Sequence, residues 1–325
     1  MFLNPLLNIM MQLLNEYGDT GMNKKRLIFV GIILITVVVS VKFFIANSPA
    51  LTKQNDKPIV AVSTFSLYEV SNVIAGETLK VSPIVPLGSD AHMFSPSPSA
   101  VAEISNSAFF VYNGAGFETW AQSLKQTLPS AVKVIDMSKH VALLKENDQA
   151  AFDPHYWLDI ENMIKMTRTL EAEFSRHYPE NTQLYHQNAS AYIAKLEKLK
   201  ADYQAGLKEC KNRTLVSNHD AFGYLASANK LENISIIGLS SDEQASANVI
   251  AKIIALVKEH GIKTIFFEEM INDNVAQTIA AETGAKAQPL QPLENISEDE
   301  LKSHQTYESI MRTNLVKLTE AMECH

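Results

Sequence analysis

The chain has 325 residues, of which 46% are hydrophobic and 20% charged, so it is long enough for about two packed domains and is not intrinsically disordered. The formal net charge is −8, and the lysines and arginines are scattered, which argues against nucleic acid as a partner. There are two cysteines and no Cys-x-x-Cys pair, which excludes a zinc knuckle and a thioredoxin-like redox motif.

Residues 1–57 are predicted to be a signal or anchor segment followed by a linker. A basic stretch at 22–26 precedes the apolar run Leu27–Val41, which is the pattern of a secretory signal peptide, and small residues at 48–50 offer a cleavage site. We expect a periplasmic protein with a cleaved signal peptide, with a retained N-terminal membrane anchor as the alternative. No cysteine lies directly after the run, so a bacterial lipoprotein anchor is not expected.

Residues 58–178 are predicted to form an N-terminal α/β lobe. Short apolar runs alternate with helical patterns, which indicates a mostly parallel sheet flanked by helices. The predicted strands are 58–63, 79–85, 108–112 and 133–136. The predicted helices are 66–75, one that begins at Ser97-Pro98, 116–128 and 158–178, with a loop over 137–153.

One long linking helix is predicted over residues 179–208. Pro179 suits the first turn of a helix, and six residues recur at spacings of three and four along one face. They are Tyr185, Ala189, Tyr192, Leu196, Leu199 and Tyr203. An uninterrupted helix between two α/β halves would hold two lobes at a constant separation.

Residues 209–325 repeat the strand–helix alternation and are predicted to form a C-terminal α/β lobe. The predicted strands are 213–217, 235–239, 263–268 and 286–290. The predicted helices are 221–229, 247–260, 273–283 and 298–322.

Three histidines follow predicted strands or lie in long loops, namely His92, His155 and His219. Open α/β sheets bind ligands at the carboxyl ends of their strands, so we expect the three imidazoles to meet between the lobes. Each has a nearby aspartate, and metal-bound imidazoles usually donate their second N–H to a carboxylate or carbonyl. Imidazole suits zinc, copper, nickel and iron, and three imidazoles with one oxygen donor make a tetrahedral zinc site.

Six segments, in order along the chain, carry a resemblance to a known family. They are Ala91–Ser99, Tyr112–Trp120, Asp153–Asp159, Ser217–Tyr224, Ile265–Glu268 and Glu282–Lys286. In these segments the chain resembles the solute-binding proteins of zinc and manganese ABC transporters, the ZnuA/TroA-like metal receptors. The resemblance covers roughly residues 58–325 and implies two α/β lobes, one rigid helix and one metal ion between the lobes.

The resemblance further implies that His92, His155 and His219 are metal ligands. Manganese receptors often have Glu where this chain has His219, which favours Zn²⁺ over Mn²⁺ as cargo. Gln291 stands where the family often has an Asp ligand, and a neutral amide is a poorer zinc ligand than a carboxylate. The fourth ligand is then expected to be Glu268 or a water molecule.

The function implied is a monomeric, non-enzymatic receptor that delivers zinc to the membrane permease subunits of an ABC importer. A manganese receptor of the same type is one alternative. A zinc-dependent hydrolase or hydratase is another, because an open three-histidine site can activate water and Glu268 could act as general base. A surface adhesin that holds metal is a third.

The cysteines Cys210 and Cys324 leave two interpretations open. In an exported protein they could form a disulfide that closes a loop of about 115 residues, with a stabilisation of roughly 4–5 kcal/mol in the loop-entropy model. Two unpaired thiols are the alternative, because pairing depends on a geometry that the sequence does not contain.

Overall fold

A computed structural model describes residues 57–145, 152–239, 245–268 and 274–325. The chain divides into two units, Met1–Asp56 and Lys57–His325. The segment predicted to be a signal or anchor, residues 1–57, lies outside the described residues apart from Lys57. Within the described ranges, no helix combines the length and apolar character needed to cross a membrane.

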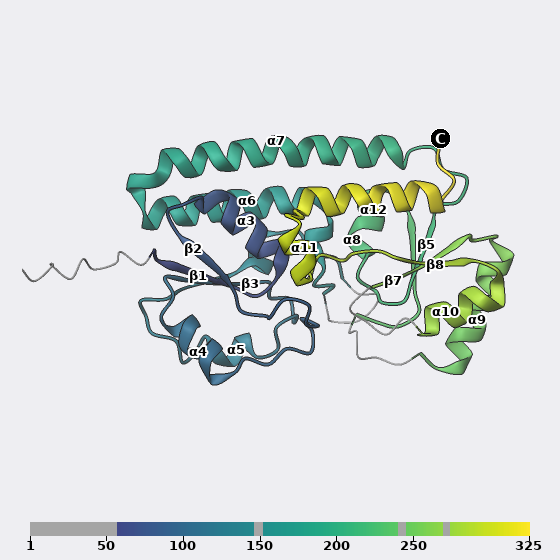
Figure 1. Ribbon diagram of the computed structural model, residues 1–325, viewed down its shortest axis with the longest axis horizontal. Helices are drawn as coiled ribbons and strands as arrows, with labels where there is room; N and C mark the ends of the chain where they lie inside the picture. Colours follow the sequence, from purple (N-terminus) through teal and green to yellow (C-terminus); the bar gives the residue numbers. More distant parts are fainter. Residues whose placement is uncertain (1–56, 146–151, 240–244, 269–273) are drawn as a thin grey trace, which may run out of the picture. The chain divides into compact units, whose positions relative to one another are not determined.

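The N-terminal lobe contains a four-stranded parallel sheet, as the strand–helix alternation predicted (Figure 1). Its spatial order is β2-β1-β3-β4. The strands are β1 (Ile59–Val62), β2 (Lys80–Pro83), β3 (Phe109–Tyr112) and β4 (Lys133–Asp136). The helices of this lobe are α3 (Phe65–Ala75), α4 (Pro98–Ser105), the short α5 (Ala121–Leu124) and α6 (Ile160–His177).

The predicted helix over 116–128 is wrong in extent, because only α5 is helical. Gly114 and Gly116 adopt positive φ angles of 76° and 89°, which no α-helix contains. The buried Glu118 carboxylate accepts the backbone N–H groups of Asn113 and Gly114, which stabilises a turn over the residues that a helix would otherwise use.

The C-terminal lobe contains a second four-stranded parallel sheet, with spatial order β6-β5-β7-β8. The strands are β5 (Thr214–Ser217), β6 (Glu232–Ser235), β7 (Thr264–Phe267) and β8 (Lys286–Pro289). The helices are α8 (Gly223–Ala228), α9 (Ala247–Glu259), α10 (Asn274–Thr283), α11 (Glu298–Lys302) and α12 (Tyr307–Ala321).

Two predictions for this lobe are corrected. The strand predicted at 235–239 is β6 at 232–235, because β5 pairs with 232–235 even though Glu232 and Asn233 are polar. The helix predicted at 298–322 is interrupted. His304 has a φ of 57°, and the Thr306 hydroxyl accepts the Ser309 N–H to begin a new helix, so α11 and α12 are separate.

The long helix is α7 (Thr182–Gly206), preceded by a 3₁₀ turn at Pro179–Asn181. At 1.5 Å per residue, its 25 residues span about 38 Å. It lies alongside α6 and also contacts α3 and α12 (Figure 1). Its buried residues are the six of the predicted stripe, Tyr185, Ala189, Tyr192, Leu196, Leu199 and Tyr203.

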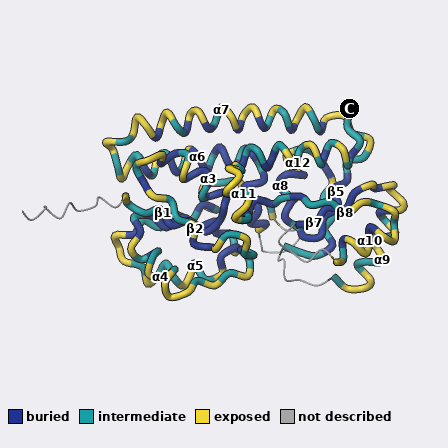
Figure 2. The backbone as a smooth tube through the Cα atoms, in the orientation of Figure 1, coloured by how far each residue is buried: buried dark blue, intermediate teal, exposed yellow. Residues whose placement is uncertain are grey.

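One hydrophobic cluster extends through both lobes. It includes Val60 of β1, Leu196 of α7, Leu215 of β5 and Leu318 of α12, all fully buried (Figure 2). Smaller clusters cover the remaining face of each sheet. Because the two lobes share this core, separating them would expose buried apolar surface to water. Each Å² so exposed would cost about 25 cal/mol of free energy.

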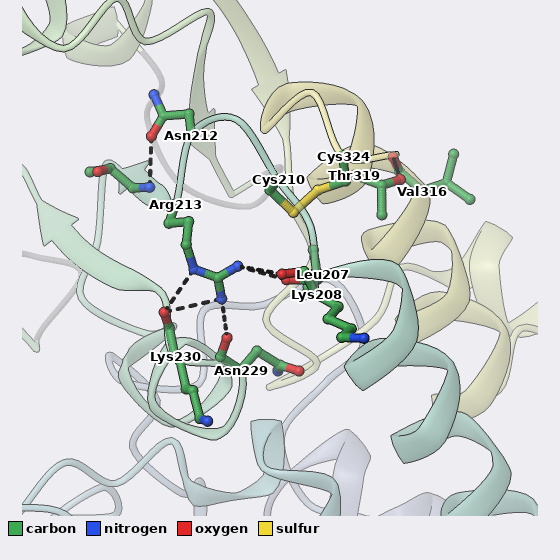
Figure 3. Close-up of a disulfide and its surroundings, with 11 residues drawn as sticks. Leu207, Lys208, Cys210, Asn212, Arg213, Asn229, Lys230, Val316, Thr319 and Cys324 are labelled. Atoms are coloured by element: carbon green, nitrogen blue, oxygen red, sulfur yellow. Dashed lines mark hydrogen bonds between the residues drawn. A yellow bond between two sulfur atoms is a disulfide. The ribbon is translucent and has the colours of Figure 1, made fainter.

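The end of α7 is joined to the end of the chain by a disulfide between Cys210 and Cys324, 114 residues apart (Figure 3). Beside it, the Arg213 guanidinium donates hydrogen bonds to the carbonyls of Leu207 and Lys208, after α7, and of Asn229 and Lys230, after α8. Carbonyls at helix C-termini lack partners within their own helix, and a cation there also complements the helix dipole.

Candidate metal centre

Four side chains form one compact group of possible metal ligands: His92, His155, His219 and Glu294. Each offers one ligand atom, and these four atoms all lie within 4.8 Å of one another. His155 and His219 are fully buried, and Glu294 and the His92 side chain are nearly so. The structure thus brings the three predicted histidines together and adds a carboxylate that the sequence analysis did not single out.

The four residues come from loops that follow strands. His92 lies in the loop after β2, His219 follows β5, and Glu294 follows β8. His155 lies in the longer connection after β4, just before the 3₁₀ turn Tyr156–Leu158. Because parallel strands present their carboxyl ends at one edge of each sheet, loops from both lobes meet at the same place.

The spacing of three of the four possible ligand atoms, those of His92, His155 and Glu294, suits a tetrahedral ion. His92 Nε2 and His155 Nε2 are 3.2 Å apart, and Glu294 Oε1 lies 3.3 Å from the first and 3.1 Å from the second. Zinc bonds of about 2.0–2.1 Å place tetrahedral ligand atoms about 3.3 Å apart. Glu294 Oε1 is buried and makes no hydrogen bond of proper geometry, so this oxygen is available to a cation that lies among the three atoms.

The His155 ring is oriented by Asp153. Oδ1 of Asp153 accepts both the backbone N–H of His155 at 2.9 Å and the ring Nδ1–H at 2.8 Å. This bond assigns the proton to Nδ1 and leaves Nε2 as the electron-pair donor that faces the group.

The His219 ring is oriented by Glu268, which the sequence analysis offered as the fourth ligand. Glu268 Oε1 lies 2.7 Å from His219 Nδ1, and the Leu239 carbonyl oxygen lies 2.9 Å from Nε2. Glu268 thus contacts the His219 ring and lies outside the group of four. Asp220, the residue after His219, accepts a hydrogen bond from the Asn233 side chain.

The electrostatics of the group favour positive charge. Burial lowers the pKa of His155, but Asp153 and Glu294 outweigh it and raise the pKa to about 10. Burial likewise lowers the pKa of His219, and Glu268 raises it to about 9. Burial raises the pKa of Glu294, yet His92 and His155 hold it well below its usual value. The same field that retains protons here would stabilise a bound cation.

Glu294 belongs to the chain that leaves β8 of the C-terminal lobe, yet it is anchored to the N-terminal lobe. Its carbonyl accepts the Phe65 N–H at 2.8 Å, and the Asn295 side-chain amide donates to the carbonyls of Pro86 and Ser89. Trp157 Nε1 donates to the Pro292 carbonyl at 2.7 Å. These bonds place the carboxylate beside His92 and His155.

Gln291, which stands at the position of the family aspartate, is directed elsewhere. Its Nε2 donates to Glu300 at 3.2 Å, and its Oε1 accepts the Leu293 N–H. The acid of this segment is three residues further on. The sequence contains this candidate carboxylate, because Glu294 ends the segment Leu290–Glu294 that also contains Gln291. It does not show the path of the loop, which decides which of the two side chains faces the histidines.

Comparisons with known proteins find zinc-binding proteins among the relatives of this chain. The family model "ZnuA: Zinc-uptake complex component A periplasmic" matches residues 60–321. The chain is 34% identical over 286 residues to the zinc-binding lipoprotein AdcA of Streptococcus pneumoniae, which covers 83% of this chain and 57% of AdcA. The Zn(II)-bound ZnuA-like domain of that protein superposes with a TM-score of 0.73 over 82% of this chain and 99% of the domain, at 34% identity.

Two further relatives have different descriptions. The high-affinity zinc uptake system protein ZnuA of Bacillus subtilis is 31% identical over 83% of this chain and 89% of its own length. The laminin-binding protein Lmb of Streptococcus agalactiae, described as bifunctional with adhesin and metal-transporting activity, is 30% identical with a TM-score of 0.75, over 82% of this chain and 99% of Lmb.

Proposed function

This chain belongs to the ZnuA family of zinc-uptake components, whose model its residues 60–321 match, and from that premise we propose that it is an extracytoplasmic receptor that captures Zn²⁺ as cargo. The single observation that carries the proposal is the buried group of three imidazoles and one carboxylate, in which the ligand atoms of His92, His155 and Glu294 have the spacing of a tetrahedral site. His92, His155, His219 and Glu294 are the proposed ligands.

The donor set supports zinc over manganese. Mn²⁺ suits carboxylate, carbonyl and water oxygens, whereas imidazole suits zinc, and three of the four donors here are imidazoles. Four protein ligands also fill a tetrahedral site, whereas catalytic zinc usually keeps one position for water or substrate. This supports a binding role over the hydrolase or hydratase alternative.

Delivery to the permease subunits of an ABC importer completes the proposal, and it rests on the family. The family is described as a periplasmic zinc-uptake component, and the Bacillus relative as part of a high-affinity uptake system. The chain spans about 57% of the length of AdcA, so what AdcA does beyond the matched part is not carried over. A monomer that is exported to the periplasm remains the working expectation.

Metal analysis tests the proposal. Purified protein should bind one zinc ion per chain, and His92→Ala, His155→Ala, His219→Ala and Glu294→Ala should each weaken binding severely. His186→Ala, on the exposed face of α7, is the matched control and should bind as the wild type does. Unchanged zinc affinity in all four site variants would refute the site. A deletion strain that grows normally under zinc starvation would refute the transport role.

Adhesion is a second candidate, which the similarity to Lmb favours. It predicts that the zinc-loaded protein is retained on a laminin-coated surface, whereas a receptor without this activity is not. The two functions can coexist, because retention on laminin and growth under zinc starvation are measured independently.

A further inference from the structure

The turn between β3 and α5 has an unusual backbone. Gly114, Ala115 and Gly116 are consecutive and have φ angles of 76°, 52° and 89°. Residues with side chains rarely adopt this left-handed region, so Ala115 in particular needs support from its surroundings. Backbones of this kind concentrate at functional sites.

Buried polar contacts support the turn. The Glu118 carboxylate accepts hydrogen bonds from the N–H groups of Asn113 and Gly114, both at 2.9 Å, and from the Ser63 hydroxyl. Tyr156 Oη donates to the Asn113 carbonyl at 3.0 Å. A Cβ on Gly114 would lie 2.1 Å from Asp136 Oδ1 and 2.6 Å from Ser138 Oγ, so another residue fits there only if these side chains move.

The residue that this turn presents is Phe117. Its ring centroid lies 4.4 Å from that of His92, 6.1 Å from that of His155 and 5.5 Å from that of Trp157. Only 4% of Phe117 is exposed. Its ring therefore covers two of the proposed ligands on one side of the site.

His92 is the proposed ligand that Phe117 contacts most closely. It lies in a loop, and its side chain is 7% exposed. Asp90 Oδ1 accepts its backbone N–H at 2.9 Å, which orients the main chain, and Phe117 packs against the ring itself.

We propose that Phe117 is a positioning residue for the metal site, held by the left-handed turn 114–116 so that it orients the His92 ring and excludes water from the bound ion. The inference rests on the proposed function and deepens it. Ligand exchange at zinc proceeds through water or chelator that reaches the ion, and the apolar shell of a metal site controls that access. Phe117 therefore slows zinc release.

The first test compares Phe117→Leu with Phe174→Leu. Phe174 is fully buried and packs against Phe109 and Tyr185, so its replacement removes the same atoms from a core position. Zinc release into excess chelator should be about 10-fold faster or more in Phe117→Leu, within the range for loss of a supporting contact, and unchanged in Phe174→Leu. The visible spectrum of the Co²⁺-loaded protein should change only in Phe117→Leu.

The second test changes the turn and keeps the ring. Gly116→Ala introduces a Cβ that meets no atom within 4 Å, so its effect is confined to the unfavourable φ. Gly284→Ala is the matched control, because Gly284 follows α10, has a φ of 74° and is equally open. Both should lower the melting temperature of the metal-free protein, but only Gly116→Ala should accelerate zinc release.

The outcomes separate the two proposals. A wild-type protein without zinc affinity refutes the proposed function and this inference with it. A wild type that binds one zinc ion, with release rates in Phe117→Leu or Gly116→Ala equal to those of the controls, refutes the inference alone. If Phe117→Leu does not fold, Gly116→Ala decides the question.

Discussion

Asp153 Oδ1 accepts two hydrogen bonds from His155, one from its backbone N–H and one from its ring Nδ1–H, so a single carboxylate orients both the loop and the imidazole. The two donors are 2.9 and 2.8 Å from the same oxygen. His155 Nε2 is thereby directed at Glu294 and His92, while Asp153 lies outside the group of four.

Asp153→Asn tests this orientation. An amide is a weaker acceptor than a carboxylate and no longer raises the basicity of the ring, so zinc affinity should fall by about 10- to 100-fold. Chelator competition measures the affinity. Asp202→Asn, in a surface ion pair with Arg312, is the control and should leave affinity unchanged. Equal affinities for the two variants would show that Asp153 does not support the ligand.

Glu294→Gln and Gln291→Glu test which position of the Leu290–Glu294 segment supplies the carboxylate ligand. Glu294→Gln keeps the shape but removes the charge, so zinc affinity should fall by two orders of magnitude or more, as for loss of a charged ligand. Adding Gln291→Glu should not restore it, because the side chain at 291 faces Glu300 and the new carboxylate would meet a like charge. Isothermal titration of the single and double variants measures this, and recovery of affinity in the double variant would contradict the assignment of Glu294.

Glu69 makes the stability of the metal-free protein depend on pH. It is 8% exposed, and burial raises its pKa from 4.5 to about 7, against the Tyr307 backbone N–H and Lys195, which lower it. Between pH 4.5 and about 7 the folded state binds more protons than the unfolded state, so stability falls as pH rises. A pKa shift of this size corresponds to a change of about 3 kcal/mol in the free energy of unfolding.

Glu69→Gln should remove this dependence. Its free energy of unfolding, measured in denaturant, should be close to that of the wild type near pH 4 and exceed it by about 3 kcal/mol near pH 8. Other titrating groups are common to both proteins and cancel in the difference. Glu197→Gln, on the exposed face of α7, should show no such divergence. A constant difference across the pH range would mean that Glu69 is not the group responsible.

The Cys210–Cys324 pair should contribute to stability and not to metal binding. It joins residues 114 positions apart, and the double variant Cys210→Ser/Cys324→Ser should lose about 4–5 kcal/mol of unfolding free energy in the loop-entropy model. The bond lies between the end of α7 and the chain terminus (Figure 3), so zinc affinity of the folded variant should be retained. Zinc affinity that falls together with stability would contradict this separation.

Several features follow from local pattern alone. The buried stripe of α7 was predictable residue by residue, because a helix repeats every 3.6 residues and its neighbours only need an apolar face. The alternation of strands and helices predicted both parallel sheets, because a helix between two strands lets the second strand run parallel to the first. Histidines after strand ends predicted the meeting place of His92, His155 and His219, since strand ends in parallel sheets share one edge.

Other features depend on contacts between distant parts of the chain. The polar β6 is a strand because β5 pairs with it, and α11 and α12 are separate because His304 turns the backbone. By itself the sequence determined which histidines would gather and roughly where. Only the tertiary structure decided that Glu294 joins them while Glu268 supports His219. A carboxylate's role depends on the path of the loop that carries it, and hydrogen bonds to residues about 200 positions away set that path.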